Sequence, residues 1–116
     1  MERRRYDRKA SLNMISYTGV DRDKNEISGR VGRTLNISEC GILLETHVPL
    51  APQSSIFLEI GLGEDIVRLT GIVVYCKDSR GKFFQTGIDF IDCFGEKDLV
   101  LKRYIDAFKH SKKKRK

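Results

Sequence analysis

The chain has 116 residues, which is enough for one hydrophobic core and too few for two. With 40% hydrophobic and 33% charged residues it has the composition of an ordinary globular protein, and no apolar run approaches the roughly 18 residues of a membrane span. The charged N-terminus lacks the apolar stretch of a signal peptide, so we expect a cytoplasmic protein without a membrane span.

The net charge of +6 is concentrated at the two ends of the chain. Residues 1–8 contain four arginines and two acids, residues 109–116 contain six bases and no acid, and residues 9–108 have a net charge of −2. This distribution disfavours a continuous nucleic-acid-binding face. It predicts a folded domain over residues 10–110, preceded by a flexible Arg-rich arm (1–9) and followed by a disordered basic tail (111–116).

The residues available for chemistry argue against an enzyme or a metal site. Cys40, Cys76 and Cys93 are widely spaced without a C-x-x-C pair, so we expect no metal and no disulfide, with each thiol buried or half-buried. The two histidines, His47 and His110, have no neighbouring nucleophile, and there is no glycine-rich phosphate loop. The carboxylates are scattered, and Asp89 and Asp92 are expected to be solvated at a strand end. We therefore predict a protein that is not an enzyme.

Alternating apolar and polar residues predict six strands, over residues 10–17, 26–35, 41–46, 55–61, 66–77 and 82–91. Leu12 and Met14 form the apolar side of the first strand, and Ile27, Val31 and Leu35 that of the second. Six short strands separated by regular turns favour a barrel or a sandwich, and closure of an antiparallel six-stranded β-barrel would remove the unpaired edges.

From Glu96 the hydrophobic period changes to that of a helix. Apolar residues then recur at helical spacing, which predicts one C-terminal α-helix over residues 96–108 with an apolar face made of Leu101, Tyr104, Ile105 and Phe108. A short amphipathic helix is marginal alone, so we expect it to pack on the barrel, most simply over its open end.

A polar turn is predicted between the second and third strands. Asn36 and Ser38 can each fold a short side chain back onto nearby backbone, which favours a turn. Gly41 permits either a positive φ or the close approach of another group where the strand resumes. The result is a rigid polar corner on an apolar scaffold, suited to holding a ligand; an ordinary β-turn is the alternative.

The N-terminal cluster Arg3, Arg4, Arg5 and Arg8 uses arginine four times and lysine not at all, unlike the Lys-rich tail. A guanidinium can make a bidentate fork to a phosphate or to a guanine edge, and its plane can stack on a base. The choice of arginine therefore favours a functional role for this cluster over a merely solvated arm.

Arg4 and Arg8 form an R-x-x-x-R motif, and Asn36, Ser38 and Gly41 form an N-x-S-x-x-G motif downstream of it. In that order the two motifs resemble the signature of the PilZ domain family, whose best-known ligand is cyclic di-GMP. Residues 87–91 look like the last barrel strand of that family and residues 96–108 like its C-terminal helix, so the resemblance covers nearly the whole chain.

The resemblance implies a non-catalytic bacterial receptor for this second messenger. Arg4 and Arg8 would clamp guanine and phosphate, Asn36 and Ser38 would hydrogen-bond them, and Gly41 would keep the corner tight. Arg3 and Arg5 are additional candidates. No cofactor beyond the ligand cyclic di-GMP is implied, and a conformational switch would signal to an unidentified downstream protein. Two alternatives stay open, namely a PilZ-like adaptor that does not bind the dinucleotide and a small barrel that binds single-stranded nucleic acid.

Overall fold

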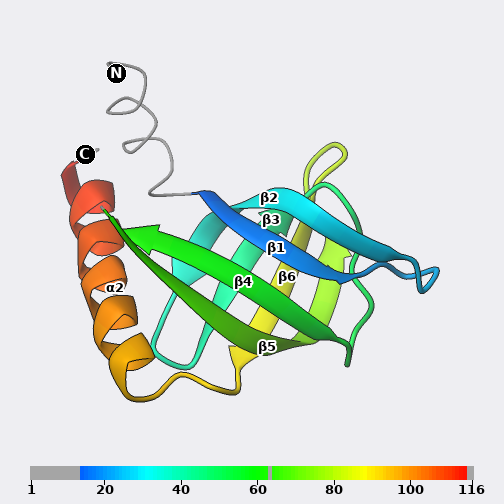
Figure 1. Ribbon diagram of the computed structural model, residues 1–116. Helices are drawn as coiled ribbons and strands as arrows, with labels where there is room; N and C mark the ends of the chain where they lie inside the picture. Colours follow the sequence, from blue (N-terminus) through cyan, green and yellow to red (C-terminus); the bar gives the residue numbers. More distant parts are fainter. Residues whose placement is uncertain (1–13, 63, 115–116) are drawn as a thin grey trace.

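The structure is a computed structural model that describes residues 14–62 and 64–114 (Figure 1). These residues form six strands and one helix: β1 (Met14–Val20), β2 (Glu26–Ile37), β3 (Gly41–Thr46), β4 (Ser55–Leu62), β5 (Asp65–Asp78), β6 (Phe84–Phe90) and α2 (Glu96–Lys114).

The strands close into an antiparallel barrel in the order β1-β2-β3-β6-β5-β4. Closure is made by β1 and β4, which pair over three residues of each strand, from Ser16 opposite Glu59 to Thr18 opposite Phe57. Among the described residues every strand has a hydrogen-bonded neighbour on each side, so the sheet has no edge strand there. The predicted fold, a six-stranded antiparallel barrel with one C-terminal helix, is confirmed.

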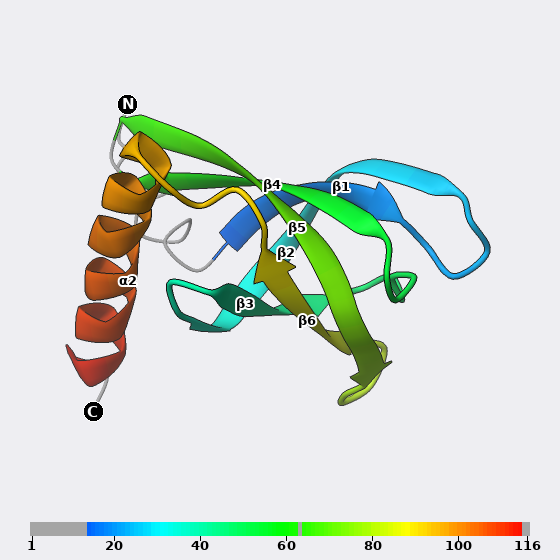
Figure 2. The same cartoon turned by 90° about the horizontal axis from the view of Figure 1, so that it is seen from below.

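Helix α2 lies across one end of the barrel (Figures 1 and 2). Its predicted apolar face, made of Leu101, Tyr104, Ile105 and Phe108, is buried in the same core as the inward side chains of the strands. The Tyr104 hydroxyl and Thr34 Oγ1 on β2 are 3.1 Å apart in a buried hydrogen bond. The helix begins at Glu96 as predicted but continues to Lys114, where the sequence favoured a disordered tail.

The apolar side of the first two strands differs from the sequence prediction. Met14 and Val31 were expected to face inward, yet their side chains are 42% and 45% exposed, whereas Ile15 is 1% exposed. A period-two pattern read one residue out of phase places every side chain on the wrong face. On β2 the inward phase includes Gly32, because the Leu44 side chain fills the space that a Cβ there would occupy. A buried glycine gives no hydrophobic signal, so the alternation misleads.

Candidate ligand-binding groove

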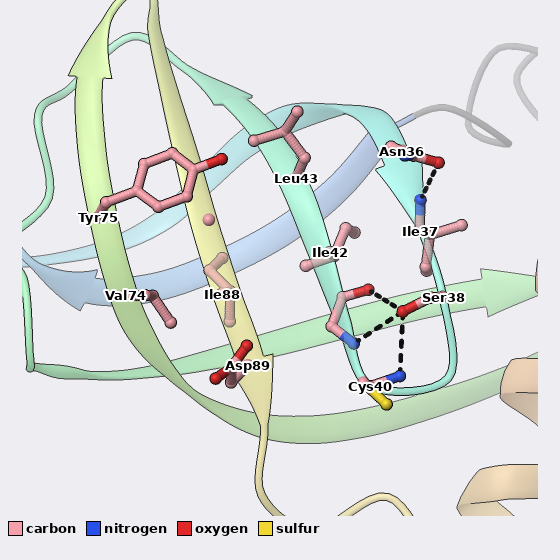
Figure 3. A pocket seen from close by; sticks show the side chains of 12 residues that line it. Asn36, Ile37, Ser38, Cys40, Ile42, Leu43, Val74, Tyr75, Ile88 and Asp89 are labelled. Carbon is pink, nitrogen blue, oxygen red and sulfur yellow. Dashed lines mark hydrogen bonds between the residues drawn. The ribbon is translucent and has the colours of Figure 1, made fainter.

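Asn36, Ser38 and Gly41, the three predicted barrel residues of the site, lie together. They line a shallow groove of about 280 Å³ on the outside of β3, β5 and β6 (Figure 3). Its remaining lining is made of Ile37, Cys40, Ile42, Leu43, Val74, Tyr75, Gly87, Ile88 and Asp89. The polar turn between β2 and β3 therefore forms one end of a groove, as expected of a ligand cradle.

Ser38 fixes the backbone of this turn. Its Oγ accepts hydrogen bonds from the backbone N–H groups of Cys40 at 3.1 Å and Gly41 at 3.3 Å, and its own N–H donates to the Gly41 carbonyl at 2.9 Å. The prediction that the Ser38 side chain folds back onto the backbone is confirmed. The hydroxyl hydrogen has only a long contact of 3.5 Å to the Gly41 carbonyl, so it can turn toward a ligand.

Asn36 is the last but one residue of β2 and not part of the turn itself. A bulge between Thr34 and Asn36 shifts the pairing with β3 by one residue and leaves the Asn36 side chain exposed at the groove. Its Oδ1 accepts a hydrogen bond from the Ile37 N–H at 2.9 Å. Within the described residues its amide NH₂ group has no partner, so two donors are available to a ligand.

Gly41 is required by a close approach and not by its own backbone conformation. The glycines with positive φ in the described chain are Gly29, Gly81 and Gly95. A Cβ at Gly41 would collide with the carbonyl oxygen of Ile88, because β3 and β6 pair with Gly41 opposite Asp89. The sequence left open whether Gly41 serves a positive φ or a close approach, and the structure shows that it serves the close approach of β3 and β6.

Tyr75 is a groove residue that the sequence did not reveal. It stands opposite Gly87 at a bulge between Val73 and Tyr75, and its ring packs on that glycine, where a Cβ would lie 2.5 Å from Cε2 and 2.8 Å from Cζ. The ring is nonetheless partly exposed, and the Lys77 ammonium is 5.8 Å from its centroid. The sequence signal for this contact is an aromatic residue opposite a glycine on the neighbouring strand. It can be recognised only when the register of the two strands is known.

The two strand-end carboxylates have different surroundings. Asp89 is exposed, as predicted, and lines the groove. Asp92 is not simply solvated, because it accepts a hydrogen bond from the Thr70 N–H at 2.7 Å and a salt bridge from Lys97 at 2.9 Å. Burial opposes its ionisation, but these bonds from Thr70 and Lys97 outweigh burial and hold the pKa of Asp92 below its usual value. This carboxylate joins β5 to the start of α2.

The candidate arginines Arg3, Arg4, Arg5 and Arg8 lie outside the described residues, but the point at which their segment joins the barrel is described. Met14 pairs with Arg33, three residues before Asn36 on β2. At about 3.3 Å per strand residue, β1 therefore begins roughly 10 Å along β2 from Asn36. Arg8 is six positions before Met14 in the sequence, and a chain of that length can span at most about 20 Å.

Comparison with known families gives the same assignment as the two motifs. The PilZ domain model matches residues 2–107, nearly the whole chain, including both motifs. The chain belongs to the PilZ domain family. No curated protein and no solved structure matches it.

Within the described part of this PilZ domain, no group of three or more histidines, cysteines and carboxylates is arranged to hold a metal ion, and no helix is long and apolar enough to cross a membrane. All three cysteines are free. Cys40 is exposed, contrary to the expectation of a buried or half-buried thiol, because it lies in the turn at the groove. Cys93 is half-buried, and burial together with the nearby Asp98 carboxylate raises the pKa of its thiol.

Proposed function

We propose that this PilZ domain is a non-catalytic receptor for cyclic di-GMP, which binds between the N-terminal arginines and the groove on β3, β5 and β6. The observation that supports the proposal most directly is the convergence of Asn36, Ser38 and Gly41 at one groove, at the end of the barrel where β1 begins. The family assignment agrees with it.

The groove has the chemistry to recognise a guanine. The free NH₂ donors of Asn36 match the O6 and N7 acceptors of the base, and the Asp89 carboxylate can accept from its N1 and N2 donors. The Tyr75 ring offers a flat surface for stacking. The Ser38 hydroxyl, held at the turn, can donate to a phosphate oxygen.

The groove does not have the chemistry to neutralise two phosphates. No lysine or arginine is among its described lining residues, and Asp89 adds a negative charge. The positive charge must therefore come from elsewhere in the chain, and Arg4 and Arg8 belong to a segment that joins the barrel beside β2. Binding would draw this segment over the groove and create a new surface, which a downstream protein partner would read.

Calorimetric titration of the full chain with cyclic di-GMP tests the proposal. A charge-assisted hydrogen bond is worth about 1.5–3 kcal/mol, so Arg8→Ala should weaken binding at least about tenfold. Arg8→Lys should restore only part of the affinity, because lysine keeps the charge and loses the fork. Arg30→Ala, an exposed arginine on β2 outside the groove, is the matched control and should bind like the wild type.

Two results would count against the receptor. If Arg8→Ala bound cyclic di-GMP as tightly as the wild type, the arginine arm would not be part of the binding site. A wild-type chain that releases no heat and shows no thermal stabilisation with the dinucleotide would favour a PilZ-like adaptor that acts through a protein surface alone.

A further inference from the structure

The side of the barrel away from the groove carries large apolar side chains on its outer face. Met14, Val31, Phe57 and Ile66 are 42%, 45%, 55% and 67% exposed. In the closed strand order, β1 and β4 lie across the barrel from β6 and β3, which carry the groove. We call this surface the β1–β4 face and define it by these four residues with Glu59 and Arg68.

Strand register places the members of this face side by side. Ser16 on β1 is opposite both Val31 on β2 and Glu59 on β4, and Glu59 is in turn opposite Arg68 on β5. These residues therefore form one row across four strands. Phe57, two residues along β4, lies on one side of the row, and Met14 and Ile66 lie on the other.

The face is hollowed on both sides of this row. Met14, Val31 and Ile66 line a depression of about 270 Å³ together with Glu59, while Phe57 and Arg68 line an adjoining one of about 560 Å³. The inward side of the same strands already forms a complete core, so these outward apolar groups contribute nothing to it. Aromatic, methionine and arginine side chains around such hollows are typical of a protein–protein contact.

We propose that the β1–β4 face binds the same face of a second copy of this chain. The chain has a net charge of +6, so most approaches of two copies are repulsive, yet the central charges of this face are one acid and one base. Glu59 and Arg68 form an ion pair of 2.7 Å, with 47% and 79% of their side chains exposed. A two-fold axis between them brings Glu59 of each copy to Arg68 of the other, and it places Phe57 and Ile66, which flank this pair on β4 and β5, inside the contact.

This arrangement is independent of cyclic di-GMP binding. The groove is centred on β3 and β6, across the barrel from β1 and β4, and its β5 residues Val74 and Tyr75 are six and seven residues along that strand from Arg68, so both grooves of the dimer stay open. Failure of the dimer therefore leaves the receptor proposal intact, and the reverse is also true.

Sedimentation of the full chain over a concentration series is the first test. The wild type should approach twice the 13.3 kDa mass of one chain as concentration rises. Phe57→Glu should raise the dissociation constant of the dimer at least about tenfold, because it places a charge in the apolar contact. Leu99→Glu, at a comparably exposed position on α2, is the control and should leave the dimer unchanged. Circular dichroism on each variant confirms that it is folded.

Charge exchange between the two central positions distinguishes a second copy from any other partner. Glu59→Arg alone and Arg68→Glu alone should each be monomeric, since like charges then face each other across the axis. An equal mixture of the two should form a heterodimer, and the double variant should dimerise again. A wild-type chain that stays monomeric at every concentration, a dimer insensitive to Phe57→Glu, or a mixture that fails to associate would each overturn the assignment.

Discussion

Removal of the Tyr75 ring should weaken cyclic di-GMP binding without unfolding the barrel. Base–aromatic stacking is worth about 1–3 kcal/mol per base when measured by alanine substitution. The Cε2–Cζ side of this ring packs on Gly87 and the Lys77 ammonium lies over the ring, 5.8 Å from its centroid, so a base that stacks there has to displace the Lys77 side chain. The ring is also held in place before binding, which lowers the entropy cost. We therefore expect Tyr75→Ala to lose about 1.4 kcal/mol, or roughly tenfold in affinity.

Three further variants separate the presence of the ring from its position. Tyr75→Phe keeps the stacking surface and should bind within about threefold of the wild type. Gly87→Ala keeps the ring but places a Cβ 2.5 Å from its Cε2, so the ring must tilt and affinity should fall. Phe57→Ala removes a comparably exposed aromatic ring on the opposite strands and should not affect binding.

The readout is the dissociation constant from calorimetry at one fixed salt concentration, with a urea unfolding curve for each variant. If Tyr75→Ala bound as tightly as the wild type while Ser38→Ala bound more weakly, the ligand would lie on the β2–β3 turn alone. The stacking argument would then be wrong, although the receptor itself would stand.

The remaining predictions concern stability. Tyr104→Phe removes the hydroxyl bonded to buried Thr34 and should lower the free energy of unfolding in urea by about 1–2 kcal/mol; an unchanged value would refute a role for this bond in fixing α2. Gly41→Ala should cost about 1–3 kcal/mol and weaken ligand binding, while Gly61→Ala, where a Cβ fits, should be nearly neutral; equal effects would contradict the close-approach argument. The lowered pKa of Asp92 means that its ionised form stabilises the fold above the unfolded pKa of about 3.9, and that this contribution is lost as pH falls through the folded value. Asp92→Asn should therefore be less stable than the wild type at neutral pH, with a gap that closes in acid; a gap of constant size would exclude the carboxylate charge as its cause.

The elements that sequence predicted best are those with strong local signals. Strand β3 has the predicted bounds, and α2 begins at the predicted residue, because period and turn residues agree there. The facing of β2 was wrong because Gly32 occupies part of its inward phase, so Val31 was the apolar residue that stood out; on β1 the prediction followed Leu12 and Met14, although Ile15 and Tyr17 are the residues that face inward. What alternation assigned to the core is in fact part of the β1–β4 face.

The groove residues also differ in how strong a local sequence signal they give. The local geometry at Asn36, Ser38 and Gly41 was predictable because side chains that fold back and a glycine at a close approach give a signal within six residues. Tyr75 gave no such signal, because its place in the groove depends on its cross-strand partner Gly87, twelve residues away and in a register that a bulge has shifted. Contacts set by register are invisible in a single sequence until the strands are paired.

Met14 connects the two surfaces of this barrel. It is the first described residue of β1, through which the arginine segment joins the domain, and it also lines the smaller depression of the β1–β4 face. The segment proposed to bind the dinucleotide thus joins the barrel at the margin of the proposed dimer contact. Because binding free energies are linked, any effect of the second copy on ligand affinity must equal the effect of the ligand on dimer affinity. Both can be measured on the same chain.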